Sequence, residues 1–171
     1  MSANMDGIAI VGMAGRFPGA ASIEEYWANL IAGRESITRF EPSQLDSSIP
    51  SALLTHPRYV AARGVLSDAD RFDAAFFDIP AREALLTDPQ QRVFLELCWN
   101  ALEHAAIDTT RTKASIGVYA GVSNNSYRKL VEARPDLVNA SGEFVAMLAN
   151  EKDYVATRVA HRIGLTGPAI S

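Results

Sequence analysis

The hydrophobic positions of the chain form strand-like runs that alternate with segments of helical spacing. Residues 7–12 are uninterruptedly apolar and rich in branched side chains, which is typical of a strand buried on both faces. Residues 115–121 predict a second strand, and residues 169–171 resemble the first residues of another. Helical spacing recurs from residue 23, from residue 89 and from residue 151. Strands alternating with helices favour a layered α/β domain.

Local signals delimit the first two helices. Ser22 and Glu25 form a capping box, and Gly33 supplies a C-terminal stop. Asp88 is the expected N-cap of the second helix, with Pro89 at its first position and Gln91 placed to reach back. The apolar stripe predicted for the first helix consists of Ile23, Tyr26, Trp27, Leu30 and Ile31. The stripe predicted for the second helix consists of Val93, Phe94, Leu97, Cys98, Ala101, Leu102 and Ala105.

The third helix is expected to run from about residue 151 to residue 163, with Asn150 as its cap and Gly164 at its end. The spacing predicts that Arg158 and Arg162 face outward. The buried stripe of this helix is predicted to consist of Tyr154, Val155, Val159 and Ile163.

Composition narrows the class of protein. The 171 residues are 48% hydrophobic and 21% charged with a net charge of −4, as in an ordinary globular domain with no basic field to favour nucleic acid. The single cysteine cannot form an internal disulfide, which fits a reducing cytoplasm. The most apolar run, residues 7–15, is far shorter than the ~20 residues that span a bilayer, so no membrane association is expected.

Candidate catalytic and metal-binding residues find little support. Cys98 lies in mid-helix on the apolar stripe, where a small core residue is expected rather than a thiolate nucleophile. The glycines after the first strand do not form a dinucleotide-binding pattern. Four aspartates lack the spacing of a calcium-binding loop, namely Asp68, Asp70, Asp73 and Asp78. Three histidines lack the spacing of metal ligands, namely His56, His104 and His161. The residues alone therefore assemble no active site and no metal site.

Five segments, in order along the chain, resemble the β-ketoacyl synthase (ketosynthase) domains of modular type I polyketide synthases. They are residues 7–20 (GIAIVGMAGRFPGA), 71–79 (RFDAAFFDI), 82–84 with 88–92 (REA and DPQQR), 99–105 (WNALEHA), and 150–154 leading to 164–168 (NEKDY and GLTGP).

The resemblance implies a thiolase-like condensing-enzyme fold, of which residues 1–171 would be an incomplete N-terminal half with helices layered on a central sheet. In this family a strand after Gly-Pro leads to a nucleophilic cysteine, and two later histidines assist decarboxylation of the extender unit. None of these three residues matches a position here, so no catalytic residue is assigned. No cofactor is expected to bind directly, because the family's acyl substrates are carried on the phosphopantetheine of an acyl carrier protein.

The resemblance also suggests where substrate and partners would bind. In relatives the loop at residues 122–127 lies near the acyl pocket and the dimer seam, which makes Asn124, Asn125 and Tyr127 candidate substrate-binding residues. Expected partners are an acyl carrier protein or neighbouring megasynthase domains, and a complementary ketosynthase half or a second copy. The surface expected for such contacts is the helix face of Val155, Val159 and Ile163 with the edge of residues 169–170.

Two functions remain open from the sequence. The chain is either the N-terminal portion of a ketosynthase that condenses acyl thioesters, inactive by itself, or a naturally truncated ketosynthase that acts as a structural interaction module of a megasynthase. A reading frame that continues beyond Ser171 would favour the first function, and a stop codon there would favour the second.

Overall fold

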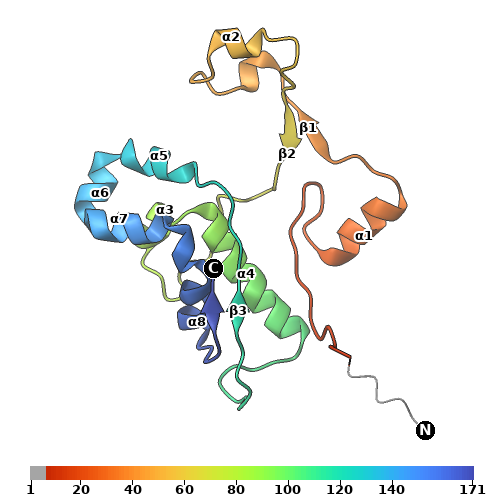
Figure 1. The fold of residues 1–171 in the computed structure, drawn as a ribbon, viewed down its shortest axis with the longest axis vertical. Helices are drawn as coiled ribbons and strands as arrows, with labels where there is room; N and C mark the ends of the chain where they lie inside the picture. Colours follow the sequence, from red (N-terminus) through yellow and green to blue (C-terminus); the bar gives the residue numbers. More distant parts are fainter. Residues whose placement is uncertain (1–6) are drawn as a thin grey trace. The chain divides into compact units, whose positions relative to one another are not determined.

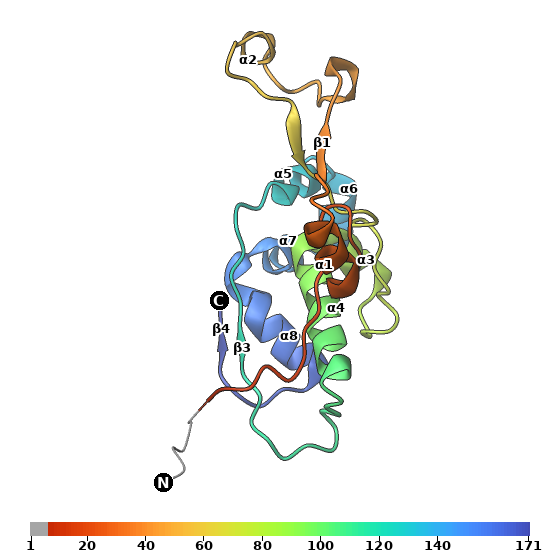
Figure 2. The same cartoon turned by 90° about the vertical axis from the view of Figure 1, so that its right-hand side faces the viewer.

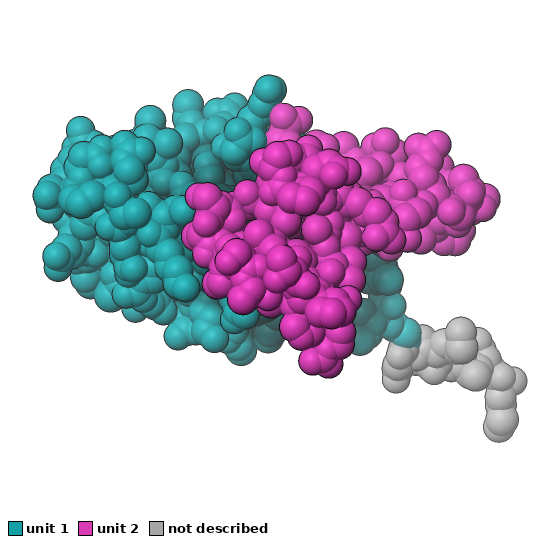
Figure 3. All heavy atoms as spheres, turned by 90° about the horizontal axis from the view of Figure 1, so that it is seen from above, with its two compact units in different colours: residues 1–14, 69–171 teal, residues 15–68 magenta. Residues whose placement is uncertain are grey.

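A computed structural model describes residues 7–171. The chain divides into two compact units, one of residues 15–68 and one of residues 1–14 with 69–171 (Figure 3). The smaller unit is therefore an insertion between two parts of the larger one. None of the helices within residues 7–171 is long and apolar enough to cross a lipid bilayer.

The smaller unit contains a hairpin of two short strands. Strand β1 (Ile37–Arg39) pairs antiparallel with β2 (Ala62–Gly64), and Thr38 lies opposite Arg63 (Figure 1). The 3-10 helix η1 (Pro42–Gln44) and the short helix α2 (Ser51–Leu54) lie in the connection between the strands. Helix α1 (Ile23–Ile31) precedes the hairpin.

The predicted boundaries of α1 are confirmed, but its predicted buried stripe is wrong. The amide of Glu25 donates to Oγ of Ser22 at 3.2 Å, and Gly33 ends the helix with φ +61°. Trp27 and Ile31 are nevertheless exposed, and the buried residue of α1 is Asn29, whose Nδ2 donates to the carbonyl of Gly19. Only one hydrophobic residue of the smaller unit, Ala20, is buried. The unit therefore has no hydrophobic core against which the α1 stripe could pack.

The main core of the larger unit surrounds helix α8 (Val155–Ile163). This helix contacts α4 (Pro89–His104) and both strands of a two-stranded parallel sheet, β3 (Val118–Tyr119) and β4 (Ala169–Ile170) (Figure 2). The two strands were predicted from the sequence and are confirmed, although each is short. The buried residues of this core are Phe77, Ile79, Ala84, Leu95, Val118, Ala156, Val159 and Ile163.

A second hydrophobic cluster holds four shorter helices together. These are α3 (Ala81–Leu86), α5 (Tyr127–Glu132), α6 (Pro135–Ser141) and α7 (Glu143–Asn150). The buried residues of this cluster are Leu86, Val131, Ala146 and Ala149, and Leu137 and Val138 of α6 pack against it. The pattern of hydrophobic positions predicted none of these four helices.

The strand predicted at residues 7–12 does not form. No ladder partner pairs with these residues within the described part of the chain, and Ile8 and Ile10 are almost fully exposed. The C-terminal end of the segment is attached to α4: the amide of Met13 donates to Nδ1 of His104 at 3.0 Å, and Gly12 lies against the main chain of Ala101. An apolar run becomes a strand only when another strand supplies hydrogen bonds, and residues 7–171 supply none.

The start of α4 is confirmed in part. Oδ1 of Asp88 accepts from the amide of Gln90 at 2.8 Å, and Pro89 occupies the first helical position. Gln91 does not reach back to the cap as predicted, because its side chain is buried and bonded to distant residues. Leu95, absent from the predicted stripe, is 1% exposed.

The predictions for the third helix are confirmed only in part. Asn150 is the last residue of α7 rather than a cap, and the 3-10 helix η2 (Lys152–Tyr154) precedes α8. Arg158 and Arg162 do not face outward, because each bonds to a carboxylate from another helix. The predicted buried stripe is confirmed for Val155, Val159 and Ile163 and is wrong for Tyr154, which is exposed. The helix part of the predicted docking surface is therefore already covered within this chain, whereas Ile170, at its predicted edge, is exposed. The end of α8 at Gly164, with φ +76°, is confirmed.

Candidate functional site

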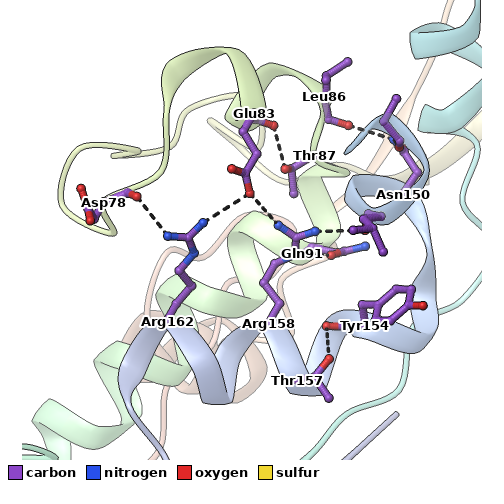
Figure 4. Close-up of polar contacts among 12 residues, drawn as sticks. Asp78, Glu83, Leu86, Thr87, Gln91, Asn150, Tyr154, Thr157, Arg158 and Arg162 are labelled. Carbon is purple, nitrogen blue, oxygen red and sulfur yellow. Dashed lines mark hydrogen bonds and ion pairs between the residues drawn. The ribbon is translucent and has the colours of Figure 1, made fainter. Parts of the chain in front are cut away.

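The polar side chains of the larger unit converge where α8 faces α3 (Figure 4). Oε1 of Glu83 accepts from Nη1 of Arg158 at 3.2 Å and from Nη2 of Arg162 at 3.4 Å. The side chains of Arg158 and Arg162 are only 13% and 21% exposed. One carboxylate of α3 is therefore shared by two guanidinium groups that lie one turn apart on α8.

Arg158 connects this ion pair to two further helices. Its Nε donates to Oε1 of Gln91 on α4 at 3.0 Å, and its Nη2 donates to the carbonyl of Leu148 on α7 at 3.0 Å. Gln91 in turn donates from Nε2 to the carbonyl of Glu151 at 3.1 Å. All three guanidinium nitrogens of Arg158 thus donate to acceptors, as a buried cation requires.

Asn150 extends the network to the loop before α5. Its Nδ2 donates to the carbonyl of Leu86 at 2.9 Å and to that of Ala146 at 2.8 Å, while its own carbonyl accepts from Nδ2 of Asn125 at 2.6 Å. Hydrogen bonds of these two neighbouring groups therefore join α3, α4, α7, α8 and the loop before α5.

The network carries excess positive charge. Burial lowers the pKa of the Arg158 guanidinium; the carboxylate of Glu83 opposes this effect, and the nearby charge of Arg162 adds to it. An arginine remains protonated at neutral pH in spite of such shifts. Two cations and one anion leave a net charge of +1 on these three residues.

The three residues predicted to bind substrate have structural contacts at the edge of this network. Asn124 is exposed, and its carbonyl accepts from Nε2 of Gln90 at 3.4 Å. Asn125 bonds to Asn150, and the hydroxyl of Tyr127 donates to the carbonyl of Leu85 at 2.7 Å. The three residues thus contact three different helices, α4, α7 and α3, and substrate binding by them stays a prediction.

Cys98 behaves as a core residue. It is half-buried against the main hydrophobic core, and burial raises the pKa of its thiol to about 11. Within residues 7–171 no group of three His, Cys, Asp or Glu side chains is arranged to hold a metal ion. Of the four clustered aspartates, Asp73 caps a turn by accepting from the amide of Phe76 at 3.0 Å.

Sequence reasoning missed the main members of the network. Glu83 and Gln91 stood out only as parts of longer motifs, and Arg158 and Arg162 were predicted to face solvent. One signal was present in the sequence: the two arginines are four residues apart, so they lie on one face of the helix. Their partner Glu83 is 75 residues from Arg158, a distance at which helical periodicity gives no information.

Comparison with known proteins places the chain in a family. The family model described as the β-ketoacyl synthase N-terminal domain matches residues 5–171. The chain is 42% identical, over its whole length, to one subunit of the phenolphthiocerol/phthiocerol polyketide synthase of Mycobacterium tuberculosis, and covers 12% of that protein. It is 37% identical to polyketide synthase PksL of Bacillus subtilis, with 96% of the chain and 4% of the relative covered.

Solved ketosynthase structures agree with this match. Ketosynthase twelve of the bacillaene polyketide synthase from Bacillus amyloliquefaciens superposes with a TM-score of 0.77 at 34% identity, over 95% of this chain and 28% of that one. A ketosynthase from module 6 of the bacillaene synthase of Bacillus subtilis gives a TM-score of 0.75 at 34% identity, and the match covers 96% of this chain and 26% of that ketosynthase. The chain therefore spans about a quarter of these ketosynthases. The resemblance to ketosynthases and the thiolase-like fold class are both confirmed: the chain belongs to the β-ketoacyl synthase family, as part of the N-terminal half of a polyketide synthase ketosynthase domain.

Proposed function

We propose that this chain is the N-terminal scaffold of a ketosynthase that catalyses decarboxylative Claisen condensation of acyl thioesters. The observation that carries the proposal is the 42% identity over the whole chain to a component of a polyketide synthase. In this reaction an acyl group is transferred from a thioester to a cysteine thiolate, and the thiol of the donor is released. The extender unit then loses carbon dioxide to give an enolate, which attacks the acyl carbonyl and displaces the cysteine thiolate. The substrates are carried on the phosphopantetheine of an acyl carrier protein.

The residues of this chain contribute architecture to that reaction. The amide of Ala156, in the first turn of α8, donates to Oγ of Ser171 at 3.1 Å, so the end of β4 is held at the start of α8. The network of Glu83, Gln91 and Arg158 fixes α8 against α3 and α4. We infer that these contacts set the direction of the strand that leads, in this family, to the nucleophile. Cys98 has no catalytic role in this proposal.

Exposed apolar residues support the need for another polypeptide surface. Ile8, Ile10 and Val11 are 101%, 81% and 65% exposed, and Phe144 on α7 is 68% exposed. Apolar residues gathered in an extended segment are typical of a surface that another element covers. The proposed covering is the remainder of a ketosynthase or a second copy, with an acyl carrier protein as the substrate-bearing partner.

A chimera tests the proposal. The matching segment of the ketosynthase in the Mycobacterium tuberculosis relative would be replaced by this chain, and the product of condensation would be measured by mass spectrometry. We expect a β-ketoacyl thioester from the chimera and none from this chain alone. A chimera that folds and associates normally but forms no product would contradict the enzymatic proposal and favour the alternative, a non-catalytic interaction module.

A further inference from the structure

We propose that the groove between α7 and α8 is a binding site for a carboxylate attached to a short apolar stem. The groove has a volume of about 350 Å³ and is open to solvent. Its lining residues are Glu83 of α3, Val145 and Leu148 of α7, Tyr154, and Thr157, Arg158, His161 and Arg162 of α8. Neither the condensation reaction nor the match to ketosynthases assigns a ligand to this place, and the proposal does not depend on the proposed function.

The charge of the groove calls for an anion. Arg158 and Arg162 both donate to Oε1 of Glu83, so a single carboxylate neutralises only one of two cations. Each guanidinium lies within a partly desolvated wall, where an uncompensated charge is costlier than in water. One additional monoanion would bring the net charge of these groups to zero.

Arg162 has hydrogen-bonding capacity left for such an anion. Its Nη1 donates to the carbonyl of Asp78 at 3.0 Å and its Nη2 donates to Glu83. Nε of Arg162 donates to no acceptor in residues 7–171, and a guanidinium group carries five N–H donors. Arg158, by contrast, already uses all three nitrogens. The binding contact is therefore assigned to Arg162, with Arg158 contributing charge.

The other wall of the groove selects the kind of anion. Val145 and Leu148 present aliphatic side chains beside the arginines, and Tyr154 adds an aromatic ring that is 43% exposed. This combination suits an alkyl stem with a terminal carboxylate. Inorganic phosphate carries between one and two negative charges at neutral pH and has no apolar part, so it does not match the aliphatic wall. The volume lies at the small end for ligand pockets, which limits the stem to a few carbon atoms.

Titration of the intact chain with sodium butyrate tests the site. The ¹H–¹⁵N resonances of the arginine Nε groups and of the α7 and α8 amides would be followed by NMR at constant ionic strength, with sodium phosphate and sodium chloride as comparison anions. We expect a saturable shift of Arg162 with butyrate and weaker binding of phosphate. A shift that does not saturate, or one no larger than that produced by chloride, would overturn the proposal.

Two variants separate binding from folding. Arg162→Gln removes the binding cation and Glu83→Gln removes the competing anion, and both delete the same ion pair. We expect butyrate affinity to fall by at least about fivefold in the first and to rise by at least about fivefold in the second, because one charge at about 4 Å has that effect in bulk water and a larger one in a partly desolvated wall. Loss of structure would weaken binding in both variants, so equal changes would contradict the proposal. The matched control is Arg111→Gln. Arg111 is 86% exposed, and its ion pair with Asp108 lies outside the groove.

The carboxylate could be a free short-chain acid or the side chain of a glutamate in another polypeptide. A tripeptide, acetyl-Ala-Glu-Ala-amide, distinguishes these sources because it presents the same carboxylate on a backbone. Tighter binding of the tripeptide than of butyrate would assign the groove to a polypeptide partner. Tighter binding of butyrate would assign it to a small acid, and binding of neither would refute the site.

Discussion

Nε of Arg158 donates to Oε1 of Gln91 at 3.0 Å and so joins α8 to the first turn of α4, 67 residues earlier in the chain. Gln91 is 2% exposed, and its amide group uses its oxygen for Arg158 and its nitrogen for the carbonyl of Glu151. A buried amide with both ends satisfied restricts the orientation of the helices that meet there. The junction is therefore held by specific polar contacts as well as by apolar packing.

Removal of Arg158 is expected to destabilise the larger unit. Arg158→Met keeps much of the side-chain volume but leaves Oε1 of Gln91 and the carbonyl of Leu148 without a donor. We expect a loss of about 2–3 kcal/mol in the free energy of unfolding, measured by chemical denaturation. Arg111→Met, in an exposed pair with Asp108, should change stability by less than about 1 kcal/mol. Equal effects of the two substitutions would contradict the assigned role of Arg158.

Gly12 should be intolerant of a side chain. A Cβ atom added there would lie 2.4 Å from the carbonyl oxygen of Ala101 and 2.8 Å from Cβ of Ala105, so Gly12→Ala forces the segment away from α4. We expect the amide of Met13 to lose its hydrogen-exchange protection, because its bond to His104 depends on the same contact. Gly121→Ala is the control, since a Cβ atom there meets nothing within 4 Å. Unchanged protection of Met13 in Gly12→Ala would show that the attachment is placed wrongly.

Cys98 should behave as an unreactive thiol. Burial raises the pKa of Cys98 to about 11, so incubation with an acyl thioester at neutral pH should leave the intact mass of the chain unchanged. Rapid stoichiometric acylation at Cys98 would contradict this expectation.

The raised pKa of Cys98 also predicts how stability depends on pH. The thiol of the unfolded chain ionises near pH 8.5, and the unfolded state therefore releases this proton first as the pH rises. The free energy of unfolding should accordingly fall above about pH 8.5, and a Cys98→Ala variant should lack this component of the decrease.

The cap and the core of α4 should differ in their contribution to stability. Asp88→Ala removes the acceptor of the Gln90 amide and should cost about 1 kcal/mol. Trp99→Ala should cost about 3 kcal/mol, because the ring is half-buried and packs edge-on against Phe76 and Phe77 with centroid distances of 5.0 and 6.5 Å. Denaturant titration that finds the cap variant less stable than the Trp variant would mean that the core face of α4 is misassigned.

The sequence predicted features that depend on neighbouring residues. The starts of α1 and α4, and the stops at Gly33 and Gly164, rest on side chains and backbone angles within a few residues. Neighbouring residues could not show that residues 7–12 would fail to form a strand, because a strand needs a hydrogen-bonding partner from elsewhere in the chain. Helices α5–α7 are each eight residues or shorter, too short for a clear apolar period.

The candidate site was predictable only in part. An arginine at helical spacing is normally assigned to solvent, and only the tertiary structure brings Glu83 within reach of Arg158 and Arg162. Asn150 has a residue type favoured at helix starts, yet its amide is needed to satisfy the carbonyls of Leu86 and Ala146. Both errors arise because long-range hydrogen bonds outweigh local preference at buried polar positions.

Light scattering of the isolated chain, combined with binding of a hydrophobic dye, tests the central claim that this scaffold requires another polypeptide surface. The exposed residues Ile8, Ile10 and Val11 predict self-association at micromolar concentration and strong dye binding. The double substitution Ile8→Ser with Ile10→Ser should weaken both signals, since neither side chain is packed within this chain. A monodisperse monomer that binds no dye would contradict the claim.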